Sequence, residues 1–208
     1  MTEIQTDQPN LYLVTPQAFD LTSFLPRLQA VLDAEPIACV RLALASDDED
    51  MLAHAADACR EICHLRDVPL VLTGPATLAE RLGLDGVHLT DGARSVRATR
   101  KALGADAIVG AFCGTSRHDG MSAGEAGADY IAFGPLGPSP LSDAAPAEHE
   151  LFEWWSQMIE LPVVAEGALT PDLVARFAPV TDFFAFGPEI WREEDAVAAL
   201  RRLIAPIR

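Results

Sequence analysis

The chain has 208 residues, a length typical of one domain, and half of its residues are hydrophobic. Its 31 acidic residues outnumber its 15 basic ones, which gives a net charge of −16. A surface of this charge repels polyanions, so we expect neither nucleic acid nor an anionic membrane as a partner. The four cysteines are too few for a disulfide scaffold, and we expect no signal peptide, so a cytoplasmic protein is predicted.

Short apolar runs recur along the chain, and turn residues bound each of them. Their brevity and their content of Val, Ile, Leu, Ala and Phe are typical of parallel strands buried on both faces. The runs are Leu11–Val14, Ile37–Leu44, Leu70–Leu72, Gly86–Leu89, Ala107–Phe112, Tyr130–Phe133, Val163–Ala165 and Phe183–Phe186.

The segments between these runs have helical patterns. Ser46 and Glu49 have the spacing of a capping box, which predicts a helix after Ser46. Further helices are predicted to start at Thr170-Pro171, to follow Gly74-Pro75 as far as Arg81, and to run from about Glu193 to Leu203. Eight strand and helix units in this length predict an α/β fold, a single (β/α)8 TIM barrel over residues 1–208, with residues 1–10 as a loosely ordered N-terminal extension.

One motif occurs twice. Residues 129–135 and residues 182–188 each consist of an acidic residue, an apolar strand and a Gly-Pro pair. The repetition predicts that the sixth and eighth strands lie in matched environments, although two strands of similar composition would also produce it.

In a TIM barrel, ligands bind to the loops that follow the strands. Gly167 and Gly187 follow the seventh and eighth strands, where such barrels often bind phosphate, because glycine lets backbone N–H groups approach an anion. We therefore predict a phosphate site at these two glycines; the alternative is that both only turn the chain. Glu166 precedes Gly167 and is predicted to line the substrate pocket.

The loop after the fifth strand contains Ser116, Arg117 and His118, a hydroxyl, a fixed cation and a titratable base. These three are the predicted catalytic residues; an exposed polar loop is the alternative. His88, within the fourth strand, either points into the pocket or packs in the core. Asp91 either binds a hard cation such as Mg²⁺ or caps a helix from Gly92 onward, and we favour the cap.

The motifs DGVHL, GADYIAFGP, LPVVAEGALTPD and TDFFAFGPEI together resemble thiamine phosphate synthase and its relative thiazole tautomerase. The likeness extends from about Pro69 to Ile190. It implies a (βα)8 barrel, possible assembly as a homodimer, and a transferase that uses Mg²⁺ to join a pyrimidine diphosphate to a thiazole phosphate. Gly167 matches the glycine that holds the thiazole phosphate, and Gly187 matches a backbone donor after the eighth strand.

Several residues that the resemblance requires are replaced. The family's Gln-x-Arg-x-Lys at the second strand becomes residues 41–45, with Arg41 first, and its Asn-Asp after the third strand becomes Thr73-Gly74. The Thr-x-Thr-Lys after the sixth strand becomes residues 139–142, which start with Ser139. Asp91 replaces the metal-binding aspartate only after a local shift.

These substitutions leave three functional hypotheses open. The first is a synthase-like protein of thiamine biosynthesis that binds a phosphorylated thiazole or a similar small phosphate, in a pocket of Arg41, Thr73, His88, Ser139 and Glu166, without most of the Mg-diphosphate residues. The second is a non-catalytic or regulatory barrel that binds a phosphorylated heterocycle. The third is an isomerase-type enzyme that uses His118.

Overall fold

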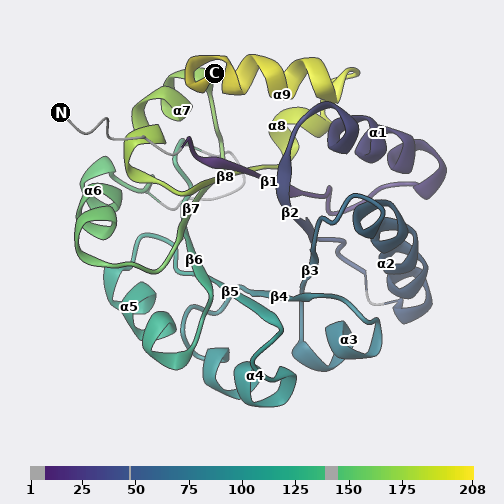
Figure 1. The fold of residues 1–208 in the computed structure, drawn as a ribbon, viewed down its shortest axis with the longest axis horizontal. Helices are drawn as coiled ribbons and strands as arrows, with labels where there is room; N and C mark the ends of the chain where they lie inside the picture. The colour runs from purple at the N-terminus through teal and green to yellow at the C-terminus, as the bar shows by residue number, and fades with distance from the viewer. Residues whose placement is uncertain (1–7, 47, 139–144) are drawn as a thin grey trace.

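A computed structural model describes residues 8–46, 48–138 and 145–208 (Figure 1). All eight strands are parallel and close into one barrel, in which each strand pairs with its neighbours in sequence and β8 pairs with β1. The strands are β1 Asn10–Val14, β2 Ile37–Leu42, β3 Leu70–Thr73, β4 Gly86–Leu89, β5 Ile108–Phe112, β6 Tyr130–Phe133, β7 Val163–Glu166 and β8 Phe183–Phe186. The predicted TIM barrel is confirmed.

Helices form a ring around the barrel, as Figure 1 shows. In the described part of the chain, none of them is long and apolar enough to cross a lipid bilayer. The helices are α1 Leu21–Ala34, α2 Glu49–His64, α3 Ala76–Arg81, α4 Val96–Leu103, α5 Arg117–Ala126, α6 His149–Met158, α7 Pro171–Phe177, α8 Pro188–Trp191 and α9 Ala196–Ile204, with 3-10 turns η1 Ala178–Val180 and η2 Ala205–Ile207.

Five of the eight strands have one boundary that lies one or two residues from the prediction, and two of these differences have a local cause. The first strand already includes Asn10, whose N–H donates to the carbonyl oxygen of Asp182 at 2.8 Å, so the barrel holds part of the predicted extension. Residues 1–7 lie outside the described residues. The second strand ends at Leu42 rather than Leu44, because the N–H of Ala43 donates to the hydroxyl of Thr15 at 2.9 Å instead of continuing the sheet.

The start of α2 also corrects the prediction. Asp48, not Ser46, is the N-cap, because its carboxylate accepts the N–H groups of Asp50 and Met51 at 3.0 and 3.1 Å. The hydroxyl of Ser46 accepts the N–H of Asp48 at 3.1 Å and therefore shapes the turn before the helix. The helix begins at Glu49, which was predicted to complete the capping box from inside the helix.

The last helix begins later than predicted, at Ala196 rather than about Glu193. The carboxylate of Asp195 accepts the N–H three residues further on at 2.9 Å, which fixes the N-cap there. The predicted start of α7 is confirmed, because the Thr170 hydroxyl accepts the N–H of Leu173 at 3.3 Å.

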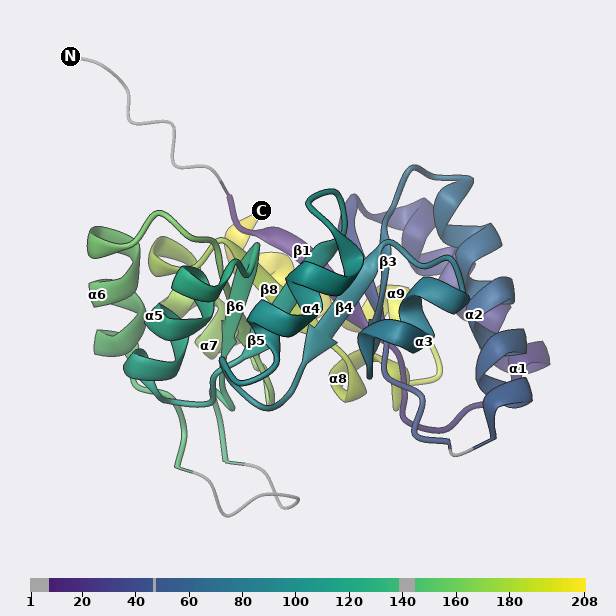
Figure 2. The same ribbon diagram turned by 90° about the horizontal axis from the view of Figure 1, so that it is seen from below.

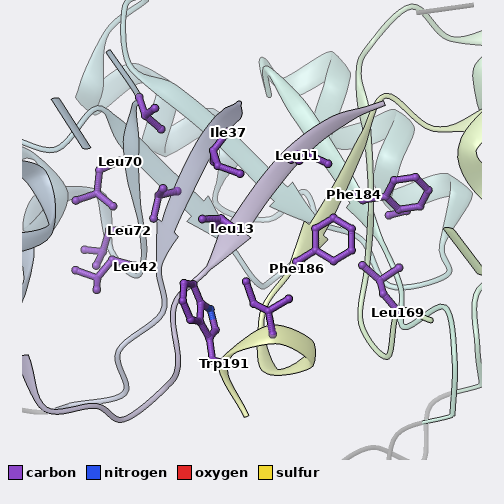
Figure 3. Close-up of a cluster of buried hydrophobic side chains, with 14 of the residues drawn as sticks. Leu11, Leu13, Ile37, Leu42, Leu70, Leu72, Leu169, Phe184, Phe186 and Trp191 are labelled. Atoms are coloured by element: carbon purple, nitrogen blue, oxygen red, sulfur yellow. The ribbon is translucent and has the colours of Figure 1, made fainter. Parts of the chain in front are cut away.

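The main hydrophobic core lies between the barrel and the helices. Leu11 and Leu13 of β1 pair in register with Phe184 and Phe186 of β8, and Figure 3 shows these side chains in the buried cluster. All four are less than 5% exposed. Burying a side chain of this size contributes about 1.5–3 kcal/mol, so this layer is the main source of stability.

A smaller cluster fills the interior of the barrel. It consists of Tyr12, Cys39, Val71, Tyr130, Ala132, Val164 and Ala185. Tyr130 fits there because Gly110, its partner in the β5–β6 register, has no side chain. A Cβ atom at Gly110 would lie 2.0 Å from Cζ of Tyr130. The lack of a side chain at Gly110 thus leaves room in the barrel interior for the ring of Tyr130.

Aspartates hold together the end of the barrel where the strands start. Each precedes an even-numbered strand and accepts a backbone N–H near the start of the strand before it, at 2.7 to 2.8 Å. The pairs are Asp85 with Leu70, Asp129 with Val109, and Asp182 with Val163. The acidic residues of the repeated motif therefore do lie in matched positions, and Asp85 adds a third example. The Gly-Pro pairs differ, because the Gly134-Pro135 peptide is cis whereas Pro188 begins α8.

Candidate functional site

A cavity of about 920 Å³ opens at the other end of the barrel, where the strands finish. In the side view of Figure 2, α8 lies at this end, directly after β8. Six of the predicted site residues line the cavity: Arg41, Thr73, His88, Glu166, Gly167 and Gly187. Ser139, the other predicted pocket residue, lies outside the described residues.

Arg41 and Glu166 form an ion pair on the floor of the cavity. Nη1 of Arg41 lies 3.0 Å from Oε2 of Glu166, and the two side chains are 10% and 16% exposed. The guanidinium also lies over the ring of Tyr12, 5.9 Å from its centre. Burial lowers the pKa of Arg41, but the Glu166 carboxylate together with Tyr12 and Tyr130 outweighs burial and raises it, so the guanidinium stays charged.

A chain of hydrogen bonds runs from the floor into the barrel. Nδ1 of His88 lies 2.9 Å from the hydroxyl of Tyr130, and this hydroxyl lies 2.8 Å from that of Tyr12. Burial, and then the charge of Arg41, hold the pKa of His88 well below its ordinary value of 6.5. The imidazole is therefore neutral, with one ring nitrogen that donates and one that accepts.

Buried polar atoms without a partner gather at this cavity. In the part of the chain that the structure describes, such side-chain atoms belong to Arg27, Arg41, Thr73, His88 and Glu166, and all five residues line the cavity. Oε2 of Glu166 is among them, because it forms the ion pair with Arg41 but no hydrogen bond of good geometry. Buried polar groups are nearly always paired in folded proteins, so this cavity is suited to a polar ligand.

Aromatic side chains form one wall of the cavity. The ring centres of Phe19 and Phe24 are 4.3 Å apart, and those of Phe24 and Trp191 are 5.0 Å apart. Trp191 is fixed by its indole N–H, which donates to the carbonyl oxygen of Val14 at 2.6 Å. The cavity therefore combines a polar floor with an apolar aromatic wall, an arrangement suited to a small ring compound.

The loops after β7 and β8 also line the cavity. Gly167 has φ +86°, a conformation that favours glycine, and a Cβ atom there would lie 3.1 Å from Pro135. The N–H of Gly187 donates to Oε2 of Glu189 at 2.9 Å, and the N–H of Leu169 donates to Oε1 of the same carboxylate at 3.2 Å. A side chain of the protein thus binds the backbone donors beside the predicted phosphate site.

The three predicted catalytic residues do not meet at one point. Ser116 is the N-cap of α5, where its hydroxyl accepts the N–H of Asp119 at 3.1 Å. Arg117 lies over the ring of Trp154, 4.1 Å from its centre. His118 lines a second hollow beside the main cavity, together with Asp91 and Asp119. Since neither Ser116 nor Arg117 lines either hollow, a catalytic role for these residues stays a prediction.

Asp91 does not cap α4 as predicted. The helix begins at Val96 with Ser95 as its N-cap, and the Asp91 carboxylate accepts the hydroxyl of Ser95 at 2.6 Å. No group of three or more possible metal ligands gathers among the described residues. Thr73, at the end of β3, offers a hydroxyl where the family resemblance requires an amide, and Gly74 has no side chain where it requires a carboxylate. The residues present therefore do not fit a magnesium site.

Comparison with known proteins assigns the chain to a family. A family model described as thiamine monophosphate synthase matches residues 11–181. The chain belongs to this family. It is 40% identical to the thiamine-phosphate synthase of Rhodospirillum centenum over 191 residues, which cover 91% of this chain and 92% of that protein. It is 38% identical to the thiamine-phosphate synthase of Erythrobacter litoralis over 213 aligned residues, 98% of each chain.

Solved structures agree with the fold. The thiamine phosphate pyrophosphorylase of Pyrococcus furiosus superposes with a TM-score of 0.82 at 19% identity, over 95% of each chain. At this identity the similarity demonstrates the shared barrel alone. The family resemblance inferred from the GADYIAFGP and PVVAEG motifs is confirmed by the family model and by the sequence relatives.

Proposed function

We propose that this member of the thiamine monophosphate synthase family binds a small phosphorylated heterocycle in the cavity at the carboxyl ends of the strands. The observation that carries the proposal is the gathering of unpartnered buried polar atoms on residues that line this one cavity. Leaving such an atom unpaired costs about 1–3 kcal/mol, so a ligand that pairs with several of them gains affinity.

The floor would recognise the edge of the ring and the wall its face. Nε–H of Arg41 is a donor, Oε2 of Glu166 is an acceptor, and the hydroxyl of Thr73 is both. These groups suit a ring that carries both donors and acceptors. Phe19 and Trp191 would cover its flat face, since aromatic rings stack on one another favourably.

The proposal includes weak or absent synthase activity. Ala43 lines the cavity where the family resemblance requires an arginine, and no carboxylate follows β3 at Thr73-Gly74. Each charge-assisted hydrogen bond lost to a diphosphate costs about 1.5–3 kcal/mol, so several losses together slow the reaction by orders of magnitude. No step is routed through Mg²⁺, since the residues present do not fit it.

Calorimetric titration with the thiazole phosphate of the thiamine pathway tests the binding proposal. We expect saturable binding by the wild-type protein and at least tenfold weaker binding by Thr73→Val, which removes one unpartnered hydroxyl. Thr181→Val is the matched control, because that buried threonine donates to the carbonyl oxygen of Val163 at 3.0 Å, at the opposite end of the barrel. The same affinity in the wild-type protein and Thr73→Val, or no binding at millimolar ligand, would refute the proposal.

A separate assay tests the catalytic part. The protein is incubated at high concentration with the pyrimidine diphosphate, the thiazole phosphate and Mg²⁺, and thiamine phosphate is detected by mass. We expect product at a rate near the uncatalysed background. Turnover typical of an enzyme, about 1 per second or faster, would contradict the loss of synthase activity.

A further inference from the structure

The carboxylate of Glu189 binds the loops after β7 and β8 at the same time. Oε2 accepts the N–H of Gly187 at 2.9 Å, and Oε1 accepts the N–H of Leu169 at 3.2 Å. Gly187 and Leu169 are buried, whereas Glu189 is half-buried and lines the cavity. One side chain thus uses both of its oxygens to join two loops that are distant in sequence.

These two N–H groups lie where the sequence predicts a phosphate site. Gly187 is one of the two predicted phosphate residues, and Leu169 follows the other, Gly167, by two positions. Backbone N–H groups that converge from two loops bind any anion of suitable size, and a carboxylate and a phosphate compete for the same donors. Pro188 has no N–H that could serve as a substitute donor.

We infer that Glu189 is a built-in anion that competes with the phosphate group of a ligand for these backbone donors. The inference rests on the proposed function, because it concerns the phosphate end of the same cavity. Glu189 is two residues from Gly187, and a short tether gives its carboxylate a high effective concentration at the donors. A phosphate that arrives while the carboxylate is bound also meets like-charge repulsion.

The consequence is that Glu189 lowers the affinity of the cavity for the phosphorylated ligand relative to the corresponding alcohol. A phosphorylated ligand must displace Glu189, whereas the corresponding alcohol can bind to the floor and wall while Glu189 stays in place. Glu189 is therefore a residue that determines specificity through the phosphate group, without contact to the ring.

Titration with inorganic phosphate tests this directly, because phosphate alone needs no heterocycle site. Glu189→Ala removes the carboxylate that accepts the two backbone N–H groups. Glu189→Gln keeps the length of the side chain but removes its charge. Glu194→Ala is the matched control, because it removes one exposed acid nearby and changes the net charge equally. We expect Glu189→Ala to bind phosphate at least tenfold more tightly than both the wild-type protein and the control, with Glu189→Gln in between.

Equal phosphate affinity in Glu189→Ala, the wild-type protein and the control, including no binding by any of them, would overturn the inference. If Glu189→Ala does not fold, the comparison of Glu189→Gln with the wild-type protein decides by the same criterion.

Parallel titrations with thiazole phosphate and with its alcohol separate this inference from the proposed function. A gain of phosphate affinity without binding of either thiazole supports the role of Glu189 and refutes the heterocycle proposal. If both thiazoles bind and Glu189→Ala does not change the ratio of their affinities, the heterocycle proposal is supported and the role of Glu189 is refuted. We expect the ratio of alcohol to phosphate affinity to fall at least tenfold in Glu189→Ala.

Discussion

The two ends of this barrel differ in whether their polar groups are hydrogen-bonded. Where the strands start, Asp85, Asp129 and Asp182 each accept a backbone N–H of a neighbouring strand. Where the strands finish, buried polar atoms of Arg41 and Thr73, among other described residues, have no partner. The barrel therefore has a paired end and an unpaired end.

The difference separates stability from function. A buried hydrogen bond that is made stabilises the fold, whereas a buried polar group left unpaired costs free energy that only a ligand can recover. In TIM barrels the end where the strands finish is the functional end, and the site proposed for this chain lies there. A substitution at the paired end should therefore lower stability without loss of binding, whereas a substitution at the unpaired end should weaken binding.

The largest effect is expected at the ion pair on the cavity floor. Arg41→Met leaves the Glu166 carboxylate buried without its cation, which should lower the free energy of unfolding by about 3 kcal/mol. The double variant Arg41→Met/Glu166→Leu removes both charges and should regain most of this loss, while ligand binding becomes at least tenfold weaker. Urea unfolding of the wild-type protein, Arg41→Met and the double variant measures these changes in the free energy of unfolding. A double variant no more stable than Arg41→Met would show that charge burial is not the cause.

The next effect concerns pH. Because the pKa of native His88 lies well below that of the unfolded chain, the unfolded state takes up the proton first as pH falls below about 6.5. Stability should therefore fall with decreasing pH, by at most about 1.4 kcal/mol per pH unit for this one group. In His88→Asn the contribution of His88 to the slope of unfolding free energy against pH should vanish. The variant His54→Asn, at an exposed histidine in α2, should keep this contribution. Identical slopes between pH 7 and pH 5 in all three proteins would contradict a buried neutral imidazole.

A smaller loss is expected at the paired end. Asp182→Ala leaves the N–H of Val163 without its acceptor and should lower the free energy of unfolding by about 2 kcal/mol. Asp182→Asn retains an acceptor oxygen and should lose less. Chemical denaturation provides the values, with Asp106→Ala at an exposed aspartate as the control. If the Asp182 and Asp106 variants are equally stable, the aspartates do not hold this end together.

The smallest effect should have the opposite sign. Thr73→Val replaces a buried hydroxyl that has no partner by a methyl group of similar shape, so stability should rise by about 1 kcal/mol. Thermal unfolding checks it, and Thr181→Val at the paired end should instead lose stability, because its hydroxyl is hydrogen-bonded. A loss of stability in Thr73→Val would mean that its hydroxyl is paired in the free protein.

Periodicity and turn residues were enough to predict the barrel. Each strand is a short apolar run between turn signals. The start of α7 was also predictable, because the cap Thr170 and the first helical residue Pro171 are neighbours in sequence. Helix starts were less certain where two capping residues compete, as Ser46 and Asp48 do before α2, because the sequence does not tell which side chain faces the free N–H groups.

The site was harder to predict because it is assembled across strands. Residues at the ends of β2, β3, β4 and β7 were identified from their position alone, but the pairing of Arg41 with Glu166 joins strands that are far apart in sequence. Tyr130 was not singled out, although the small Gly110 in the preceding strand is a signal that space is reserved for a large side chain. Ser116 was assigned to catalysis, whereas its position three residues before Asp119 also fits the N-cap that the structure shows.

One measurement tests the separation of the two ends most directly: the affinity for thiazole phosphate of a variant from each end, at a temperature where both are folded. Asp182→Asn, from the paired end, should bind within about twofold of the wild-type protein although it is less stable. Arg41→Met/Glu166→Leu, from the unpaired end, should bind at least tenfold more weakly although it is nearly as stable as the wild-type protein. Equal affinities in the two variants, or the greater loss in Asp182→Asn, would contradict the account.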